Sequence, residues 1–158
     1  NMPGILFVCT ANIARSPMAS GLFKQIASEF GEADDWRVES AGTWASDGQP
    51  AAIGSQLVMK ARGIDIASHR SQVITRQLVT ESDLILTMER GHQEALQVEL
   101  PEYAGKIYLL SEMAGQYHNI ADPYGEPFVE FERTAQEIEE ILREGYTQIK
   151  QLAGFITG

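Results

Sequence analysis

The chain has 158 residues, 44% of them hydrophobic, which suits one domain with one hydrophobic core. Its 12 basic and 22 acidic residues give a formal net charge of −10 at pH 7. This balance argues against nucleic acid as a partner, because phosphate backbones are held by clustered Lys and Arg. We therefore expect a single domain over residues 2–158.

The chain contains one cysteine, which excludes an internal disulfide and a cysteine-based metal cluster. The three histidines, His69, His92 and His118, show no spacing typical of metal ligands, so we expect no metal and no other cofactor. There is no run of about 18 apolar residues and no signal-peptide pattern. We expect no membrane insertion and a cytoplasmic location.

Predicted strands and helices alternate along the chain. A short apolar run predicts a buried strand at residues 4–8, and apolar side chains at helical spacing predict a helix at 17–30. The other predicted elements are strands at 37–40, 84–88 and 106–110 and helices at 51–62, 91–98 and 129–153. This order favours an α/β domain with a mostly parallel sheet, whose ligand sites lie at the carboxyl ends of the strands.

A candidate anion site lies between the first strand and the first helix, where five residues separate Cys9 from Arg15. A loop that closes onto a helix N-terminus directs several backbone N–H groups at one point, where the helix dipole adds positive potential. A tetrahedral oxyanion fits such a site, and the planar guanidinium of Arg15 matches two phosphate oxygens. The same field favours the thiolate of Cys9, which could attack a bound phosphorus in line.

A simpler interpretation exists for each loop residue. Cys9 alone is typical of a small buried hydrophobe at the end of a core strand. The spacing to Arg15, Ser16 and Pro17 favours the anion site, and Pro17 fits the first turn of a helix. Asn12 is either an ordinary turn residue or one chosen because it tolerates the left-handed backbone of a tight loop.

A phosphate monoester also needs an acid that protonates its leaving oxygen. Asp122 is the best candidate, because Pro123 restricts its backbone to an extended conformation and Tyr124 beside it could line an entrance. The same residues also form ordinary turns, so this segment alone does not establish the role.

The motif from Cys9 to Pro17 near the N-terminus, with Asp122 to Tyr124 near the C-terminus, resembles the low-molecular-weight protein tyrosine phosphatases. Length and motif order match along nearly the whole chain. The resemblance implies a four-stranded parallel twisted sheet, flanked by helices on both faces, with the phosphate-binding loop between the first strand and the first helix. It also implies hydrolysis of phosphotyrosine monoesters through a cysteinyl-phosphate intermediate, without a metal.

The resemblance assigns roles to individual residues. Cys9 is the expected nucleophile, Arg15 the phosphate clamp, and Asp122 the general acid and later the base for water. The residues expected to bind phosphate are Thr10, Ala11, Asn12, Ile13, Ala14, Arg15 and Ser16. Those expected to support the loop are Asn12, Ser16, Ser40 and His69, of which Ser16 also stabilises the thiolate. Without the resemblance, Ser40 and His69 are ordinary polar loop residues.

Three side chains bear on substrate choice. Ile13, Trp44 and Tyr124 are expected to wall a deep slot that takes a phenyl ring, while phosphoserine would leave its phosphate above the loop. Trp44 fits equally well as a half-exposed loop residue. The expected ligands are inorganic phosphate or a similar oxyanion, and a phosphotyrosine-containing protein such as a bacterial tyrosine kinase.

The chain departs from the family in its loop, where Ala11 replaces a common glycine and Ala14 replaces a second cysteine that can protect the nucleophile from overoxidation. Three alternatives stay open. Arsenate reductases of this fold relay a disulfide through additional cysteines, which this chain lacks. Protein-arginine phosphatases tend to carry threonine where Ile13 stands. A non-catalytic oxyanion-binding module would have no use for Asp122.

Overall fold

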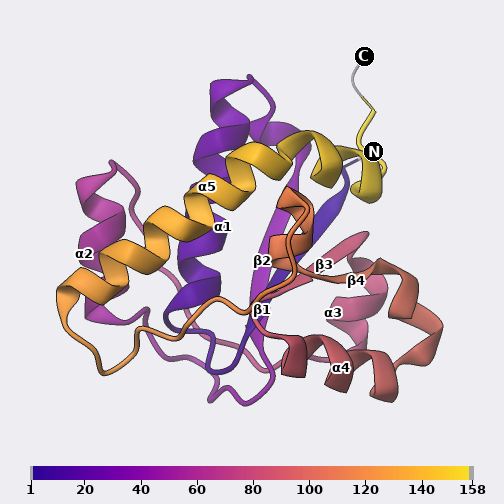
Figure 1. Cartoon of the computed structure of the whole chain (residues 1–158), viewed down its shortest axis with the longest axis horizontal. Helices are drawn as coiled ribbons and strands as arrows, with labels where there is room; N and C mark the ends of the chain where they lie inside the picture. Colours follow the sequence, from indigo (N-terminus) through magenta and orange to yellow (C-terminus); the bar gives the residue numbers. More distant parts are fainter. Residues whose placement is uncertain (1, 157–158) are drawn as a thin grey trace.

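The computed structural model describes residues 2–156, which form one α/β domain around a four-stranded parallel sheet (Figure 1). The strand order is β2-β1-β3-β4, which confirms the expected sheet. Residues 157–158 of the expected domain lie outside the described residues. The strands are β1 (Gly4–Cys9), β2 (Arg37–Gly42), β3 (Leu84–Thr87) and β4 (Ile107–Leu109).

The α-helices are α1 (Arg15–Glu29), α2 (Ile53–Ala61), α3 (Arg76–Glu81), α4 (Arg90–Glu99) and α5 (Phe128–Ala153). Short 3₁₀ helices cover Ala33–Asp35, Pro101–Lys106 and Leu110–Ala114. The sequence analysis did not predict α3, because six residues are too few to display helical periodicity. It is marked by its N-cap, since the Thr75 hydroxyl accepts a hydrogen bond from the Leu78 amide at 3.1 Å.

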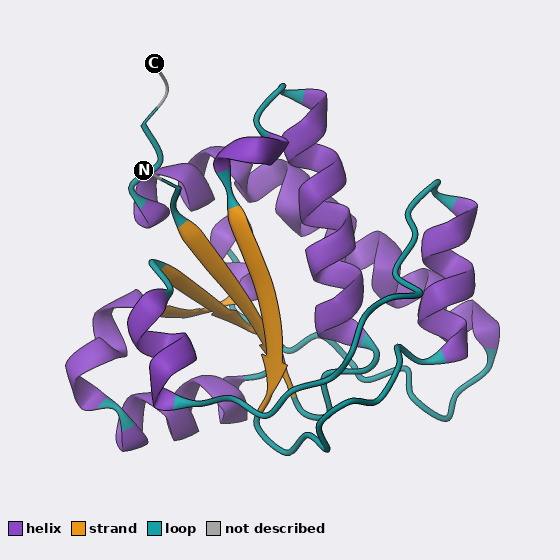
Figure 2. Cartoon of the chain, turned by 180° about the vertical axis from the view of Figure 1, so that it is seen from behind, coloured by secondary structure: helices purple, strands orange, loops and turns teal. Residues whose placement is uncertain are grey.

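Helices cover both faces of the sheet, as expected (Figure 2). Alternate residues of β1 point to opposite faces: Phe7 and Cys9 join the core under α1 and α5, while Leu6 and Val8 join the core under α3 and α4. Because β1 is buried on both sides, its sequence is a continuous apolar run without alternation. Cys9 therefore reaches the edge of the sheet on the side that α1 covers.

Strand β2 is two residues longer than predicted. Ala41 and Gly42 continue the parallel pairing to Val8 and Cys9, so β1 and β2 end together. A side chain at position 42 would collide with the carbonyl oxygen of Thr10. Glycine thus permits β2 to lie directly beside the loop that follows Cys9.

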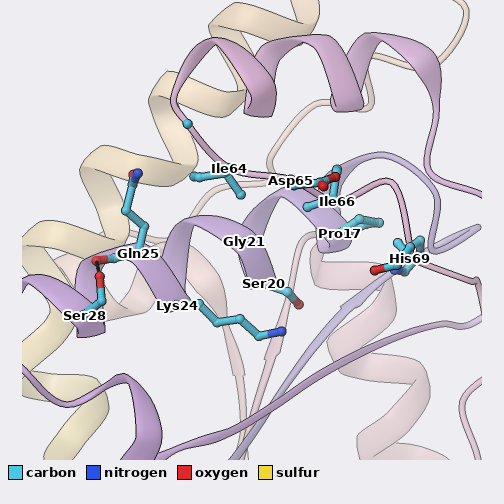
Figure 3. A pocket seen from close by; sticks show the side chains of 12 residues that line it. Pro17, Ser20, Gly21, Lys24, Gln25, Ser28, Ile64, Asp65, Ile66 and His69 are labelled. Carbon is cyan, nitrogen blue, oxygen red and sulfur yellow. Dashed lines mark hydrogen bonds between the residues drawn. The ribbon is translucent and has the colours of Figure 1, made fainter.

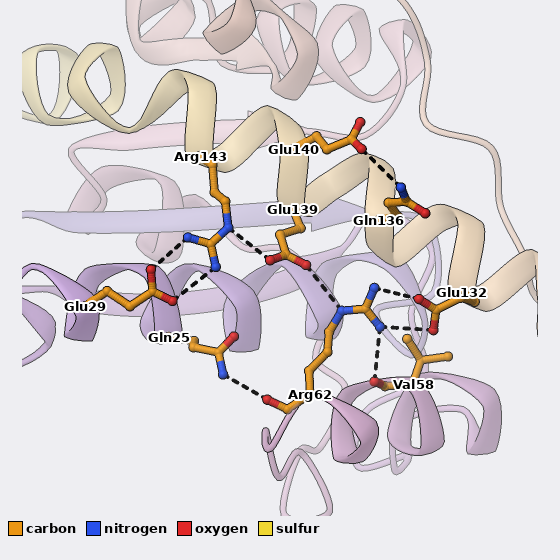
Figure 4. A network of polar contacts seen from close by, with 9 residues as sticks. All are labelled: Gln25, Glu29, Val58, Arg62, Glu132, Gln136, Glu139, Glu140 and Arg143. Carbon is orange, nitrogen blue, oxygen red and sulfur yellow. Dashed lines mark hydrogen bonds and ion pairs between the residues drawn. The ribbon is translucent and has the colours of Figure 1, made fainter.

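Two arginines join α1, α2 and α5 through a set of carboxylates, of which Glu139 contacts both arginines (Figure 4). Arg62 contacts Glu132 at 2.7 Å and Glu139 at 3.3 Å, and Arg143 contacts Glu29 at 2.8 Å and Glu139 at 3.0 Å. The hydrogen bond to Glu132 is the main reason that the pKa of Arg62 is raised. The network holds the three helices together on the same side of the sheet as Cys9.

The loop after β1 lies at the point of the sheet where the strand order reverses. β2 lies on one side of β1 and β3 on the other, so a crevice opens at their carboxyl ends. None of the helices within residues 2–156 combines the length and apolarity that a membrane crossing requires.

Candidate active site

The loop at residues 10–14 wraps around the sulfur of Cys9. The amide of Asn12 donates a hydrogen bond to Sγ at 3.3 Å. Within residues 2–156 the amides of Ala11, Ile13 and Ala14 meet no protein acceptor. Helix α1 begins directly after this loop, and its first turn also has N–H groups without intrahelical partners. A helix N-terminus and free amides are groups with which proteins bind anions, and the predicted site residues lie around them.

Asn12 holds the loop in shape and is completely buried. Its φ of 59° is left-handed, the conformation for which an asparagine is tolerated. The side-chain amide donates to Ser16 Oγ at 2.8 Å and to Ser40 Oγ at 2.9 Å, and the side-chain oxygen accepts from the Gln72 amide at 2.9 Å. Every polar group of Asn12 is therefore used once its two backbone bonds are included.

The direction of these bonds determines what Ser16 offers to the sulfur. Ser16 Oγ already accepts from Asn12, so its own proton is free to point at Cys9 Sγ, which lies 2.9 Å away. A hydroxyl proton and an amide proton then both face the sulfur. Both groups are hydrogen-bond donors, so the sulfur is placed as their acceptor.

His69 fastens the loop from the other side. Its Nε2 lies 2.7 Å from the carbonyl oxygen of Asn12, which makes Nε2 the donor. Burial lowers the pKa of His69, so the neutral ring is favoured. Figure 3 shows this histidine at the edge of a separate cavity of about 450 Å³ between α1 and residues 63–69. Neither Cys9 nor Arg15 nor Asp122 lines that cavity.

Arg15 is 1% exposed and is held by partners from two distant segments, one at Glu89 and one at residues 120–122. Nη1 donates to Glu89 Oε2 at 2.5 Å and to the carbonyl oxygen of Ile120 at 2.7 Å, while Nη2 lies 3.7 Å from Asp122 Oδ2. Glu89 and Ile120 were not predicted as neighbours of Arg15. The position of Glu89, two residues beyond the end of β3, was the available signal, because the carboxyl ends of parallel strands meet at one edge.

His92, for which the sequence predicted no role, also contacts the residues around Arg15. His92 Nδ1 accepts from the amide of Glu89 at 3.2 Å, so Nε2 carries the proton and donates to Thr10 Oγ1 at 2.9 Å. Burial lowers the pKa of His92, which agrees with this neutral form. Thr10 Oγ1 also accepts from Arg15 Nη2 at 3.3 Å. The hydroxyl proton of Thr10 is consequently free for another acceptor.

A cavity of about 180 Å³ opens above the sulfur. It is lined by Cys9, Thr10, Ala11, Ile13, Ala14, Arg15, Asp122 and Tyr124. Asn12 and Ser16 are completely buried and do not line it, so their contribution to anion binding would come through the backbone and through the sulfur. The structure thus brings the three predicted catalytic residues to one cavity.

Tyr124 and Trp44, the two predicted aromatic walls, are placed differently. Tyr124 lines the cavity, and its amide donates to Asp122 Oδ1 at 3.0 Å, so this turn aims the carboxylate of Asp122. Trp44 is 84% exposed and does not line the cavity, although its amide bonds the carbonyl of Thr10 at 2.8 Å. The role of Trp44 as a wall stays a prediction.

The site combines a sulfur nucleophile, free amides, one guanidinium and one half-exposed carboxyl group around a space for a small tetrahedral anion. These are the groups that transfer of a phosphoryl group to sulfur and then to water requires. Among residues 2–156 no group of three or more His, Cys, Asp or Glu side chains is arranged to hold a metal ion.

Comparison with known proteins agrees with this chemistry. Residues 4–153 match the family model described as low molecular weight phosphotyrosine protein phosphatase. The chain is 38% identical over 135 residues to a protein of Ralstonia nicotianae named "Probable low molecular weight protein-tyrosine-phosphatase EpsP", which covers 85% of this chain and 88% of the relative.

Two further relatives cover most of the chain. A protein-arginine-phosphatase of Bacillus subtilis is 34% identical over 148 residues, which are 93% of this chain and 97% of the relative. The crystal structure of a low molecular weight protein tyrosine phosphatase from T. tengcongensis superposes with a TM-score of 0.87 at 36% identity, over 92% of this chain and 99% of that one.

Proposed function

This chain belongs to the low molecular weight phosphotyrosine protein phosphatase family of cysteine-dependent enzymes, and from that premise we propose that it hydrolyses phosphotyrosine in proteins with Cys9 as nucleophile. The observation that carries the assignment of residues is the sulfur of Cys9 at the floor of an open cavity, facing amide and hydroxyl protons. The other residues follow from their positions around that sulfur.

In the first step the thiolate of Cys9 attacks phosphorus, and the bond from phosphorus to the tyrosine oxygen breaks. Asp122 enters this step as the carboxylic acid and gives its proton to the leaving phenolate oxygen. The location of Asp122 at the mouth of the cavity supports this role, because the leaving oxygen must point away from the sulfur in an in-line displacement.

In the second step water attacks the phosphorus of the cysteinyl phosphate. Asp122, now a carboxylate, accepts the proton of that water, and the thiolate of Cys9 leaves as inorganic phosphate forms. The Ser16 hydroxyl, 2.9 Å from the sulfur, stabilises the departing thiolate. The enzyme returns to its starting state without any other reactant.

Arg15 and the free loop amides hold the three non-bridging phosphate oxygens throughout. Glu89 and the carbonyl of Ile120 occupy Nη1 of Arg15, and Thr10 Oγ1 accepts one N–H of Nη2, which leaves the other N–H of Nη2 and that of Nε for the ligand. Glu89 also balances the guanidinium charge while that group is buried. We assign Glu89 and His92 as positioning residues that fix the guanidinium and the Thr10 hydroxyl before the substrate arrives.

The walls of the cavity favour an aromatic leaving group. Ile13 and Tyr124 supply apolar surface beside the phosphate position, where a phenyl ring can pack. The arginine phosphatases similar to this chain make phosphoarginine the main alternative substrate, and Ile13 offers that charged group no polar partner. An arsenate reductase that relays a disulfide within the chain is disfavoured by the single cysteine, and a passive anion-binding module by Asp122.

The physiological substrate is a phosphotyrosine-containing protein, and we propose a bacterial tyrosine kinase among such proteins. We place the enzyme in the cytoplasm. This choice is supported by the lone Cys9, which has to stay a free thiol and is best kept so in a reducing compartment.

Rapid-quench mass spectrometry tests the proposed function directly. An aryl phosphate mixed with the enzyme in the presence of a chelator is expected to add one phosphate to Cys9 within a single turnover. The same experiment with phosphoarginine is expected to leave Cys9 unmodified. Turnover that depends on a metal, or turnover without phosphate on Cys9, would remove the proposed mechanism.

Replacement of Asp122 tests the role of the general acid independently of the role of the nucleophile Cys9. We expect Asp122→Ala to slow aryl phosphates with poor leaving groups by about 10²–10⁴-fold, because those oxygens need a proton as the bond breaks. Aryl phosphates with good leaving groups are expected to lose far less in the first step. A series of substituted phenyl phosphates measures this dependence, and an equal loss for all of them would take the acid role away from Asp122.

A further inference from the structure

A second concave surface adjoins the catalytic cavity and has no assigned role. Its volume is about 510 Å³, and it lies between residues 49–54, which lead into α2, and residues 124–125 with Phe131 of α5. All ten residues that line it are uncharged, in a chain of which 22% of residues are charged. We refer to this surface as the α2–α5 groove.

The groove and the catalytic cavity are continuous. Ile13 and Tyr124 line both of them, so these two side chains form the ridge that a ligand crosses when it extends from one into the other. The groove is also joined to the phosphate loop by a backbone bond, since the amide of Ala52 donates to the carbonyl oxygen of Ile13 at 2.7 Å.

The groove exposes apolar side chains to solvent. Ile53 is 75% exposed and Tyr124 is 62% exposed. Gly54, which also lines the groove, lies directly against the ring of Phe131, where a Cβ atom would come within 2.6 Å of the ring. An apolar hollow of this kind gains free energy when an apolar group displaces its water.

A protein substrate whose phosphorylated side chain occupies the catalytic cavity has flanking residues within reach of this ridge. With the phosphorylated side chain in the small cavity, the neighbouring residues continue along the surface at about 3.3–3.6 Å per residue. The groove begins at the two residues that wall the cavity, so it lies within reach of the first few flanking residues. Its uncharged lining offers nothing to an acidic or basic side chain and favours an apolar one.

We propose that the α2–α5 groove is a subsite for an apolar side chain of the substrate protein, within about three residues of the phosphorylated one. The proposal rests on the proposed function, because it assumes that a phosphorylated side chain enters the catalytic cavity. It adds a sequence preference that phosphate chemistry alone does not supply.

Phosphotyrosine peptides that carry Leu or Gly at each of the three positions on either side of the phosphotyrosine test the proposal. We expect kcat/KM of the unmodified enzyme to be about 10-fold higher with Leu at one or more of these positions, from burial of that side chain. Ile53→Asp is expected to remove this preference, because it introduces a charge into the groove. Hydrolysis of a small aryl phosphate, which does not reach the groove, is expected to stay within about twofold.

Val98→Asp is the matched control, since Val98 is 79% exposed on α4 and lies outside the groove. It is expected to leave both peptide preference and aryl phosphate hydrolysis unchanged. Equal kcat/KM for Leu and Gly peptides, or an equal loss for peptides and aryl phosphate in Ile53→Asp, overturns the proposal. A dimer that Ile53→Asp dissociates, without any change in peptide preference, assigns the groove to a second copy of the chain and also overturns it. Failure of the unmodified enzyme to hydrolyse aryl phosphate would instead contradict the proposed function.

Discussion

Cys9→Ser is expected to lower turnover of an aryl phosphate by at least about 10⁴-fold, the scale on which removal of a catalytic nucleophile acts. A serine hydroxyl at this position stays protonated near neutral pH, so no anionic nucleophile faces the phosphorus. The chain contains no second cysteine that could take over. Steady-state hydrolysis at saturating substrate measures the loss.

The same variant is expected to keep its affinity for inorganic phosphate, measured by isothermal titration calorimetry. The loop amides and the guanidinium of Arg15 are unchanged by the replacement, and the anionic thiolate that repels phosphate is removed. Loss of phosphate binding together with turnover would indicate that the loop had collapsed around the new side chain. Activity within tenfold of the unmodified enzyme would show that Cys9 is not the nucleophile.

Arg15→Ala is expected to lower kcat by about 10³–10⁵-fold, the range seen when an arginine that stabilises phosphoryl transfer is lost. It is also expected to weaken phosphate binding, since a charge-assisted pair of hydrogen bonds disappears. The replacement leaves the carboxylate of Glu89 without its buried partner, so part of the loss would come from a disturbed site.

Arg15→Lys and Glu89→Gln separate these contributions. Lysine keeps the charge but cannot contact Glu89, the Ile120 carbonyl and the phosphate at the same time. We therefore expect kcat of Arg15→Lys to exceed kcat of Arg15→Ala by less than tenfold. Glu89→Gln keeps an acceptor for Nη1 and is expected to cost less than Arg15→Ala. If Arg15→Lys restores nearly full activity, charge alone suffices and the planar geometry has no role.

The part of the site that is formed by residues close together in the chain could be predicted from the sequence. The loop from Cys9 to Ser16 has to curve around one point, because a buried strand precedes it and a helix follows it. The left-handed backbone of Asn12 is a property of that residue type in tight turns. The roles expected of Ser40 and His69 came from the family resemblance; in the structure both side chains are hydrogen-bonded to Asn12.

Contacts between distant segments were not predictable in the same way. Glu89 reaches Arg15 across 74 positions and the carbonyl of Ile120 does so across 105. Each contact depends on where β3 and the segment after the 3₁₀ helix at Leu110–Ala114 arrive beside the loop. For Glu89 the sequence offers only its position just beyond β3, and for the carbonyl of Ile120 it contains no local signal.

The sequence by itself determined the chemistry of the phosphate loop and the alternation that makes a parallel sheet, because both follow from neighbouring residues and their periodicity. Only the tertiary structure decided which carboxylate pairs with Arg15 and that Tyr124 lines the cavity while Trp44 is exposed. It also decided that an uncharged groove continues from the ridge that Ile13 and Tyr124 form. These features arise where the ends of separate strands and helices meet. The relative positions of these ends are set by the packing of the whole core, which no local stretch of residues encodes.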